Sequence, residues 1–283
     1  MYNYNNNNYY NDRLKDFGYN YRALNNFVMT HTVEMCENDK ELIKAIDNTI
    51  NKQYIVYEEG FKKDNRINEE TTNIIVTKDR SMEAAKKYKG KKIAVLNFAN
   101  NHNVGGAPFS AGAQEESICR ISTLYPCLQK EDDSFYKKHQ DLYEMGKIDY
   151  LGNDDLIYSP DIVVFKSDES APKLLEESEW FKVDVITSAA PVIYYYIPNN
   201  YDEIIYSRLE KVFEVAKKEN VDVLILGAWG CGAFHNPPER VAKIFKKLLK
   251  EYYFETVEFA VFCRDGGIFE NYNIFKNVIL NES

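Results

Sequence analysis

The chain contains an apolar segment, Ile93-Ala-Val-Leu-Asn-Phe-Ala99, which runs directly into Asn100-Asn-His-Asn103-Val-Gly105-Gly106-Ala-Pro-Phe-Ser-Ala-Gly112-Ala-Gln114-Glu115-Glu116. The first part is almost continuously apolar, as expected for a strand that is buried on both faces of a sheet. Two adjacent glycines then let the backbone turn its amides toward a ligand without a Cβ in the way. A helical pattern of apolar residues follows from Gln114. The segment therefore predicts a buried strand, a glycine-rich loop and a helix.

The same alternation recurs along the rest of the chain. Apolar residues recur at helical spacing from Ile204 to Ala216 and from Val241 to Tyr252. The second of these patterns has a start signal, in which Asn236 caps the helix and Pro237 takes the first helical position. Six further segments are predicted as strands: Tyr54–Glu58, Ile74–Thr77, Asp161–Lys166, Val183–Ala189, Val221–Gly227 and Val257–Cys263. This order predicts an α/β sandwich around a mostly parallel or mixed sheet.

A second glycine-rich loop follows the predicted strand Val221–Gly227. It reads Gly227-Ala-Trp229-Gly230-Cys231-Gly232-Ala233-Phe234-His235-Asn236 and leads into a helix start, where free amides favour phosphate. The alternative is a tight turn that binds no ligand. Phe234 offers a flat face to a ribose or a base, although an aromatic side chain in the core is equally common. Cys231 has no base nearby that would activate it as a nucleophile.

Glu115 and Glu116 form an acidic doublet at the start of the helix that is predicted after the first glycine-rich loop. In the simplest alternative they only complement the helix dipole. At a strand end and after a glycine-rich turn, however, one carboxyl can donate a proton to a glycosidic oxygen while the other binds sugar hydroxyls. A helix N-terminus lowers the pKa of a carboxyl, whereas a general acid needs a raised pKa. Burial and the neighbouring carboxylate would have to outweigh the dipole.

Composition excludes several classes of protein. The 283 residues carry 35 Lys and Arg against 44 Asp and Glu, a net charge of -9, so we expect no direct binding to nucleic acid. No apolar run is long enough to span a membrane, and no leader is apparent. The five cysteines are odd in number and never form a C-x-x-C pair, which indicates a reducing cytoplasm. The four scattered histidines suggest no metal.

We divide the chain into three parts on these patterns. Residues 1–20 are Asn-rich at their start and are expected to form a flexible tail. Residues 21–90 look more helical and are expected to be an accessory region packed on the core. Residues 91–283 carry both glycine-rich loops and are expected to be the catalytic core.

Taken together, these segments resemble the microbial-type poly(ADP-ribose) glycohydrolases. The signature of that family is a Gly-Gly-Gly stretch followed several residues later by Gln-Glu-Glu, which Gly105-Gly106 and Gln114-Glu115-Glu116 resemble. The loop Gly227 to Phe234 is similar to the second diphosphate loop of the family. Weaker matches run along Met82-Glu-Ala-Ala85, Tyr158-Ser-Pro-Asp161 and Thr187-Ser-Ala-Ala-Pro191. The resemblance implies a three-layer α/β/α macrodomain-like fold with a mixed sheet and an N-terminal helical accessory region.

The resemblance also implies an activity and a role for each residue. The protein would hydrolyse the ribose–ribose O-glycosidic bond of poly(ADP-ribose), with Glu116 as general acid and base and Glu115 on the hydroxyls of the scissile ribose. Its partners would be ADP-ribose or protein-attached poly(ADP-ribose), it would act as a monomer, and no cofactor or metal is implied. Substrate-binding roles fall on Asn103, Gly105, Gly106, Gln114, Gly230, Cys231, Gly232, Ala233 and Phe234.

Two positions depart from the family pattern. Ala107 stands where the family has its third glycine, and Val192 follows Ala-Ala-Pro where Asn is expected. Either change favours two alternatives, hydrolysis of a mono-ADP-ribosyl group or non-catalytic binding of ADP-ribose. The intact doublet argues against pure binding, because a binder has no need of two desolvated carboxylates.

Overall fold

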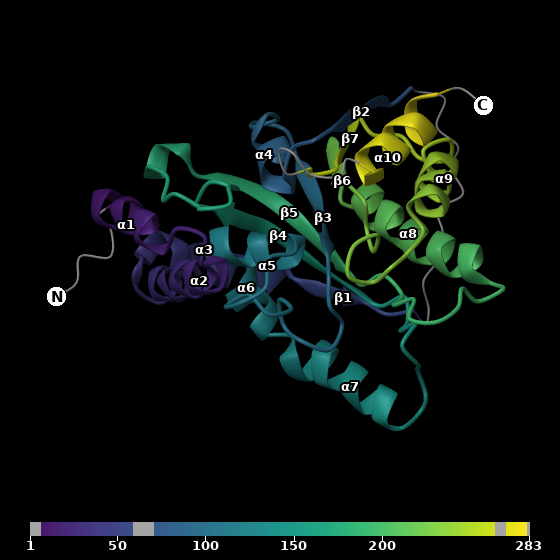
Figure 1. Ribbon diagram of the computed structural model, residues 1–283, viewed down its shortest axis with the longest axis horizontal. Coiled ribbons are helices and arrows are strands. Elements are labelled where there is room, and N and C mark those ends of the chain that lie inside the picture. Colours follow the sequence, from purple (N-terminus) through teal and green to yellow (C-terminus); the bar gives the residue numbers. More distant parts are fainter. Residues whose placement is uncertain (1–6, 59–70, 264–269, 282–283) are drawn as a thin grey trace.

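The computed structural model of the protein describes residues 7–58, 71–263 and 270–281 (Figure 1). A seven-stranded mixed sheet forms its centre, in the order β1-β4-β5-β3-β6-β7-β2. The strands are β1 (Tyr54–Val56), β2 (Asn73–Thr77), β3 (Ile93–Phe98), β4 (Leu156–Val164), β5 (Phe181–Ser188), β6 (Val223–Leu226) and β7 (Thr256–Ala260). β4 pairs with β1 and β5 in antiparallel fashion, and the other neighbours are parallel. All seven predicted strands are therefore present.

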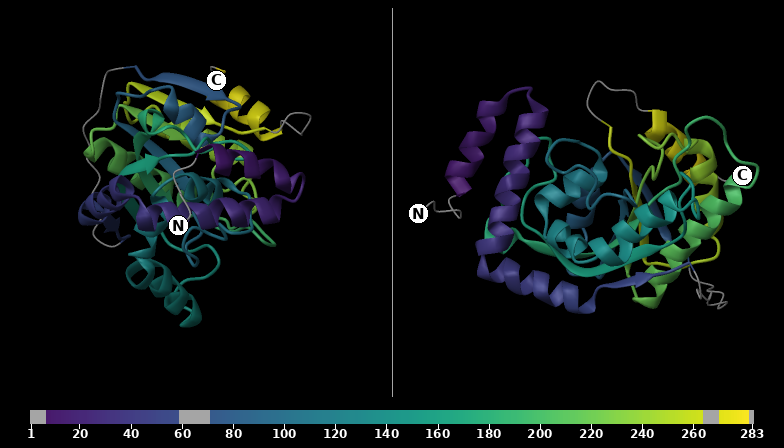
Figure 2. Two further views of the ribbon diagram at one scale, coloured as in Figure 1. Left: turned by 90° about the vertical axis from the view of Figure 1, so that its left-hand side faces the viewer. Right: turned by 90° about the horizontal axis from the view of Figure 1, so that it is seen from below.

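Helices cover both faces of this sheet, which gives the expected three layers. One core cluster lies between the sheet and α2 (Tyr21–Asn38), α3 (Lys40–Lys52), α4 (Ser81–Lys86), α5 (Gln114–Ile121) and α6 (Leu124–Gln129). The second core cluster lies between the other face and α8 (Tyr201–Lys218), α9 (Pro238–Leu248) and α10 (Glu270–Leu280). The two helical layers lie on opposite sides of the molecule (Figure 2). The remaining elements are α1 (Asn7–Arg13), η1 (Leu14–Phe17), η2 (Asp132–Tyr136), α7 (Lys137–Glu144) and η3 (Glu177–Glu179).

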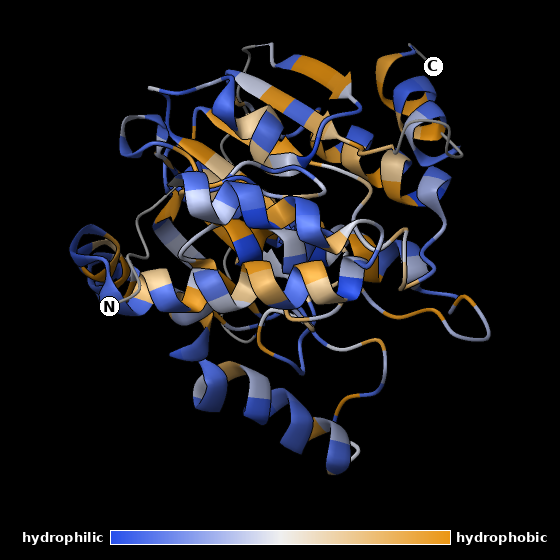
Figure 3. Cartoon of the chain, turned by 60° about the vertical axis from the view of Figure 1, so that its left-hand side comes forward, coloured by the Kyte–Doolittle hydropathy of each residue, from blue (hydrophilic) through white to orange (hydrophobic). Residues whose placement is uncertain are grey.

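The pattern of the sequence explains these layers. β3 is buried along nearly its whole length, because its alternate side chains enter the two different core clusters. The outer helices carry hydrophobic and hydrophilic bands in alternation (Figure 3). Each helix therefore buries one face against the sheet and exposes the other.

β4 begins at Leu156, five residues before the predicted start at Asp161. The register with β5 shifts between Ser159 and Ile162, and Asp161 has a left-handed backbone with φ +58°. Pro160 lies inside this bulge and has no N–H to donate to a ladder. Because proline disfavours the interior of a strand, the sequence pattern predicts only the part of β4 that follows Pro160.

The N-terminal region is more integrated than predicted. Residues 1–6 lie outside the described residues, but residues 7–17 form α1 and η1 instead of a flexible tail, with Tyr10 only 2% exposed. The Tyr10 hydroxyl donates to the Pro172 carbonyl at 2.9 Å, and its ring stacks on Phe27 at 5.5 Å. Aromatic burial thus offsets the ordering of an Asn-rich segment. The predicted accessory region, residues 21–90, supplies β1 and β2, which form opposite edges of the sheet.

Candidate active site

A cavity of about 150 Å³ lies where β3, β5 and β6 reach their carboxyl ends. Both glycine-rich loops contribute to its wall, although more than a hundred residues separate them in the chain. Its lining includes seven of the predicted site residues: Gln114, Glu115, Glu116, Gly230, Gly232, Ala233 and Phe234. The wall is completed by Phe98, Ala99, Asn100, Ala113, Ala190, Ala228 and Trp229. The acidic doublet and the second loop therefore face a single cavity.

Glu115 has both carboxylate oxygens engaged by the protein. Asn97 Nδ2 donates to Oε1 at 3.2 Å, and the Asn100 amide donates to Oε2 at 2.8 Å. The side chain is 2% exposed. Burial, with a smaller contribution from the nearby Glu116, raises the pKa of Glu115 to about 8, against the two hydrogen bonds that lower it. Burial thus outweighs the donors around this carboxyl.

Glu116 has one engaged and one free oxygen. Its Oε1 accepts the Ala107 amide at 3.1 Å, whereas its buried Oε2 has no hydrogen-bond partner in the described part of the chain. The side chain is 8% exposed and lines the cavity. A buried polar atom without a partner is uncommon in native proteins and marks a position where a ligand atom or water is expected.

Position 106 requires a glycine, because its backbone lies too close to the Glu116 carboxyl for a Cβ atom. Its φ is +69°, and a Cβ at this position would lie 2.4 Å from Glu116 Oε1 and 3.2 Å from Glu115 Oε2. Gly105 is also left-handed, and a Cβ there would meet the Cys119 sulfur at 2.9 Å. Neither glycine lines the cavity. Their role in this structure is to let the loop pass behind the doublet.

Gln114 joins three elements beside the doublet. Its Oε1 accepts the Phe98 amide at 2.9 Å, and its Nε2 donates to the Leu96 carbonyl at 2.8 Å and to Ser81 Oγ at 3.0 Å. The end of β3, the start of α4 and the start of α5 are therefore tied together by one side chain.

Two side chains, those of Arg120 and Asn25, hold the first loop in place through hydrogen bonds to its carbonyls. Arg120 Nη1 donates to the carbonyls of Pro108 at 2.9 Å and Ala111 at 2.7 Å. Asn25 of α2 donates to the carbonyls of Ser110 at 3.2 Å and Ala111 at 3.0 Å. Through these bonds the N-terminal helix α2 positions the loop that carries the Ala107 amide.

The second loop is shaped by Gly230 and Asn236. A Cβ at Gly230, where φ is +72°, would lie 2.5 Å from Ala190 Cβ and 2.6 Å from Asn236 Nδ2. Asn236 donates to the carbonyls of Pro191 at 2.8 Å and Gly230 at 3.0 Å, and it accepts from Tyr201 at 3.0 Å. The predicted helix start is therefore one residue early, because Asn236 closes the loop while Pro237 is the N-cap and Pro238 the first helical residue.

Three consecutive amides of this loop are free for a ligand. The backbone N–H groups of Gly232, Ala233 and Phe234 make no hydrogen bond within the described residues. A Cβ at Gly232 would meet nothing within 4 Å, so nothing in the described protein requires a glycine there. Adjacent free backbone amides in a loop can form a concavity that binds anions. The loop is thus suited to a phosphate group.

Two predicted binding residues have no side chain in the cavity. Cys231 packs against the second core cluster, and burial raises the pKa of its thiol to about 12. Asn103 is exposed outside the lining, and its amides bond to Asn100 Oδ1. Cys231 therefore contributes only backbone to the loop, and Asn103 would have to reach a ligand from the rim.

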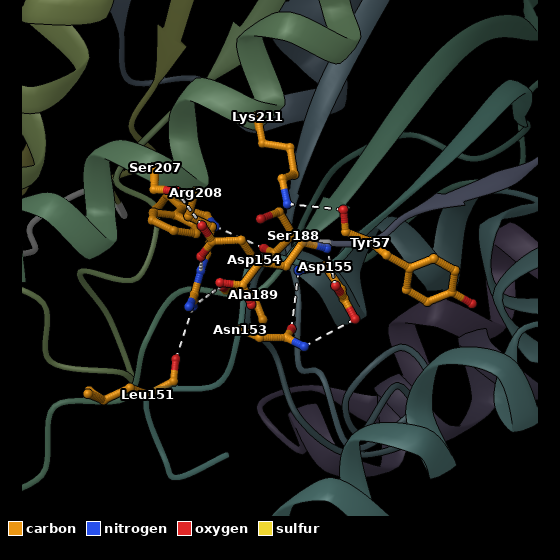
Figure 4. Close-up of polar contacts among 12 residues, drawn as sticks. Tyr57, Leu151, Asn153, Asp154, Asp155, Ser188, Ala189, Ser207, Arg208 and Lys211 are labelled. Carbon is orange, nitrogen blue, oxygen red and sulfur yellow. Dashed lines mark hydrogen bonds and ion pairs between the residues drawn. The ribbon is translucent and has the colours of Figure 1, made fainter. Parts of the chain in front are cut away.

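A buried polar network supports the β5 side of the cavity (Figure 4). Arg208 of α8 donates to the carbonyls of Ala189 at 2.8 Å and Leu151 at 3.1 Å, and its Nε contacts Asp154 Oδ1 at 3.0 Å. The Trp229 indole donates to the Ser188 carbonyl at 2.9 Å. Because Ala190 follows this anchored end of β5, the network holds one wall of the cavity in place.

Sequence reasoning missed the residues that hold the doublet from the strand side. Asn97 is fully buried within β3 and bridges Glu115 and Thr187 Oγ1. A single amide in an otherwise apolar buried strand was the available signal, because buried polar groups are normally hydrogen-bonded. Ala190 carried no such signal, since only the pairing of β5 with β3 places it at the cavity.

The arrangement supports acid–base chemistry on an anionic sugar ligand. Glu116, which carries the unpartnered buried oxygen, lines the same cavity as the residues with free amides. No group of three or more His, Cys, Asp or Glu side chains in the described ranges is placed to hold a metal ion.

Where the structure describes the chain, its helices are too short or too polar to cross a membrane.

The fold and this cavity define a macrodomain-like α/β protein with an acidic doublet. The profile of the microbial-type PARG catalytic domain, where PARG is poly(ADP-ribose) glycohydrolase, matches residues 25–167, about half of the chain. The chain therefore belongs to the microbial-type PARG family. A search of curated proteins finds no match.

Solved structures agree with this family assignment. The glycohydrolase of Thermomonospora curvata bound to the inhibitor ADP-HPD is 28% identical, with a TM-score of 0.75 over 89% of this chain and 98% of that chain. The glycohydrolase of Deinococcus radiodurans in complex with ADP-ribose is 27% identical, with a TM-score of 0.69 over 83% of this chain and 96% of that chain.

Proposed function

We propose that the protein is a poly(ADP-ribose) glycohydrolase that hydrolyses the ribose–ribose O-glycosidic bond and releases ADP-ribose, with Glu116 as general acid and base. Family membership and the ligands of the similar structures support the substrate class. The observation that carries the catalytic assignment is the buried, unpartnered Oε2 of Glu116 in the cavity wall.

The different surroundings of the two carboxyls give them separate tasks. Glu116 Oε2 is free to donate a proton to the departing 2′-oxygen as the bond from that oxygen to ribose C1″ breaks. A water molecule then forms a bond to C1″ and returns a proton to Glu116. Glu115 has both oxygens bound by Asn97 and Asn100, so it is suited to orient the ribose hydroxyls instead of exchanging a proton with the leaving group.

The two loops would hold the diphosphate. The free amides of Gly232, Ala233 and Phe234 would donate to its oxygens, with the Phe234 ring against a sugar. Gly105 and Gly106 do not line the cavity, so they would act by letting the first loop pass close to the doublet, and Asn103 would reach a ribose from the rim. Local amides thus replace the positive field that a chain with net charge -9 lacks.

We also propose that the protein acts as a monomer in a reducing cytoplasm. The five cysteines are free thiols, three of them buried. Size-exclusion chromatography with light scattering would test the monomer, and fractionation of the source cells would test the location.

Release of ADP-ribose from purified poly(ADP-ribose), measured by chromatography, tests the catalytic assignment. We expect Glu116→Gln to lower kcat by about 10²-fold or more, because the proton donor is removed. Binding of ADP-ribose by calorimetry should survive in this variant. Glu177→Gln, an exposed acidic residue of η3, is the matched control and should retain the parent rate.

Two outcomes would contradict the proposal. A Glu116→Gln variant as active as the parent would reject Glu116 as the acid. A parent that cleaves a mono-ADP-ribosylated peptide but not the polymer would instead support a mono-ADP-ribosyl hydrolase.

A further inference from the structure

A groove of about 790 Å³ lies outside the cavity, between the N-terminal helices and the first loop. Its lining includes Phe17 of η1, Arg22 and Phe27 of α2, and Phe109 of the first loop. This volume is in the range of small-molecule sites. Nothing in the proposed function accounts for an aromatic groove at this position.

The groove lies along the loop that contacts the catalytic carboxyl. The Ala107 amide lies 3.1 Å from Glu116 Oε1, and Phe109 is two residues further along the chain. Two residues span at most about 7 Å, so the Phe109 Cα lies within that distance of the Ala107 Cα. Asn25 connects the α2 wall to the Ser110 carbonyl at 3.2 Å. The groove and the cavity therefore share one loop as their common wall.

The chemistry of the lining suits a nucleotide. Phe109 is 37% exposed and offers its ring to a ligand, whereas the rings of Phe17 and Phe27 pack on each other at 5.0 Å and form the apolar floor of the groove. Flat aromatic faces stack on bases of any sequence. Arg22 is exposed and has no ion-pair partner among the residues that the structure describes, so its guanidinium is available to a diphosphate.

We propose that this groove binds the adenosine diphosphate part of the neighbouring polymer unit, whose 2′-oxygen departs from C1″ when the bond breaks. The inference rests on the proposed function, since the scissile bond joins the ribose in the cavity to the 2′-oxygen of the next adenosine. That adenosine must therefore begin near Glu116, and the groove is lined by Phe109 and Ser110 of the loop whose Ala107 amide contacts Glu116. The groove is a subsite for the remaining polymer and is not used by ADP-ribose itself.

A second exposed aromatic surface provides the competing site. Tyr194, Tyr195 and Tyr196 are 61%, 94% and 64% exposed, and the preceding Ile193 amide bonds to the Phe234 carbonyl at 2.9 Å. This loop adjoins the proposed diphosphate amides of the second loop, whereas the groove is lined by Phe109 and Ser110 of the first loop. Tyr195→Ser is therefore a matched control for loss of an exposed ring, and Lys40→Gln is the control for loss of an exposed charge.

Two substrates separate the subsite from the cavity. One is poly(ADP-ribose), and the other is ADP-ribose joined at C1″ to a small aromatic leaving group that cannot fill the groove. We expect Phe109→Ser and Arg22→Gln each to raise KM for the polymer by about 5-fold or more, as for removal of one base-stacking ring. On the small substrate kcat and KM should change by less than about 2-fold. The effect of Arg22→Gln should shrink as salt is raised.

The outcomes distinguish this inference from the proposed function. An active parent combined with an unchanged polymer KM in both groove variants overturns the inference alone. Equal losses on both substrates also overturn it, because they indicate a structural role. A Tyr195→Ser variant that raises polymer KM while the groove variants do not places the subsite on the tyrosine loop and overturns it too. A parent that cleaves neither substrate overturns the proposed function and the inference together.

Discussion

At the scale of single residues, the carboxyl of Glu115 links the chemistry of the site to the stability of the fold. Burial raises its pKa to about 8, whereas an unfolded glutamate releases its proton near about 4.3. Between these values the folded protein binds more protons than the unfolded chain. Stability therefore falls as pH rises through this window, by at most about 1.4 kcal/mol per pH unit, and levels off above it.

Replacement of Glu115 tests this linkage. Glu115→Gln does not titrate, so its melting temperature relative to the parent should rise from pH 5 to pH 8 and remain constant above pH 8.5. Other buried carboxyls with a raised pKa, such as Asp168, are common to both proteins and cancel in the difference. Thermal unfolding at several pH values measures it, and a difference independent of pH would contradict the raised pKa.

Gly106 gives a second prediction at this scale. In Gly106→Ala the new Cβ would meet Glu116 Oε1 at 2.4 Å, so the carboxyl must move. We expect kcat to fall by about 10²-fold, since a displacement of about 1 Å at a reacting group has effects of this size. The left-handed backbone adds a destabilisation of about 1–2 kcal/mol.

Gly146 is the matched control for the backbone term. Its φ of +66° is close to the +69° of Gly106, but a Cβ there meets nothing within 4 Å. Gly146→Ala should therefore lose similar stability and retain its kcat. Equal kcat values in the two variants would show that Gly106 has no special relation to Glu116.

At the scale of elements, α2 acts as a brace for the first loop. Asn25→Ala removes the donors to the carbonyls of Ser110 and Ala111, although Arg120 still holds Ala111. We expect unfolding free energy to fall by about 1–2 kcal/mol and kcat to fall on polymer and small substrate alike. Chemical denaturation and steady-state kinetics measure both effects. Asn38→Ala, near the other end of the helix, is the control and should retain kcat. An Asn25→Ala variant that loses stability but keeps the parent kcat would show that α2 does not position the first loop for catalysis.

The elements also show what the sequence could predict. β3 and β6 are evident because they are buried on both faces and read as continuous apolar runs. The first half of β4 is not evident, because Pro160 and the left-handed Asp161 interrupt the ladder. The loops that follow β3 and β6 could be identified from glycines and carboxylates alone. Asn25 and Ala190 could not be assigned, because their roles depend on contacts between segments far apart in the chain, and the lone amide of Asn97 in an apolar strand indicates a buried hydrogen bond without naming its partners.

At the scale of the whole molecule, the sheet depends on the N-terminal third of the chain. β1 pairs with β4 at one edge, and β2 pairs with β7 along five residues at the other. Lys166 is fully buried, and burial lowers its pKa, while its Nζ donates to the Val28 carbonyl at 2.9 Å and to Thr32 Oγ1 at 2.6 Å. Both partners belong to α2. The N-terminal region therefore completes the fold of the predicted catalytic core.

Two truncations separate the contribution of residues 1–20 to folding from that of residues 21–90. Removal of residues 1–20 deletes Tyr10 and Leu14 but no strand, so the protein should fold with an unfolding free energy lower by about 2–4 kcal/mol. Removal of residues 1–90 exposes both sheet edges and leaves Lys166 without its acceptors. We expect this fragment to show no cooperative thermal transition by circular dichroism and no release of ADP-ribose. A fragment 91–283 that unfolds cooperatively and retains activity would instead establish residues 21–90 as a true accessory region.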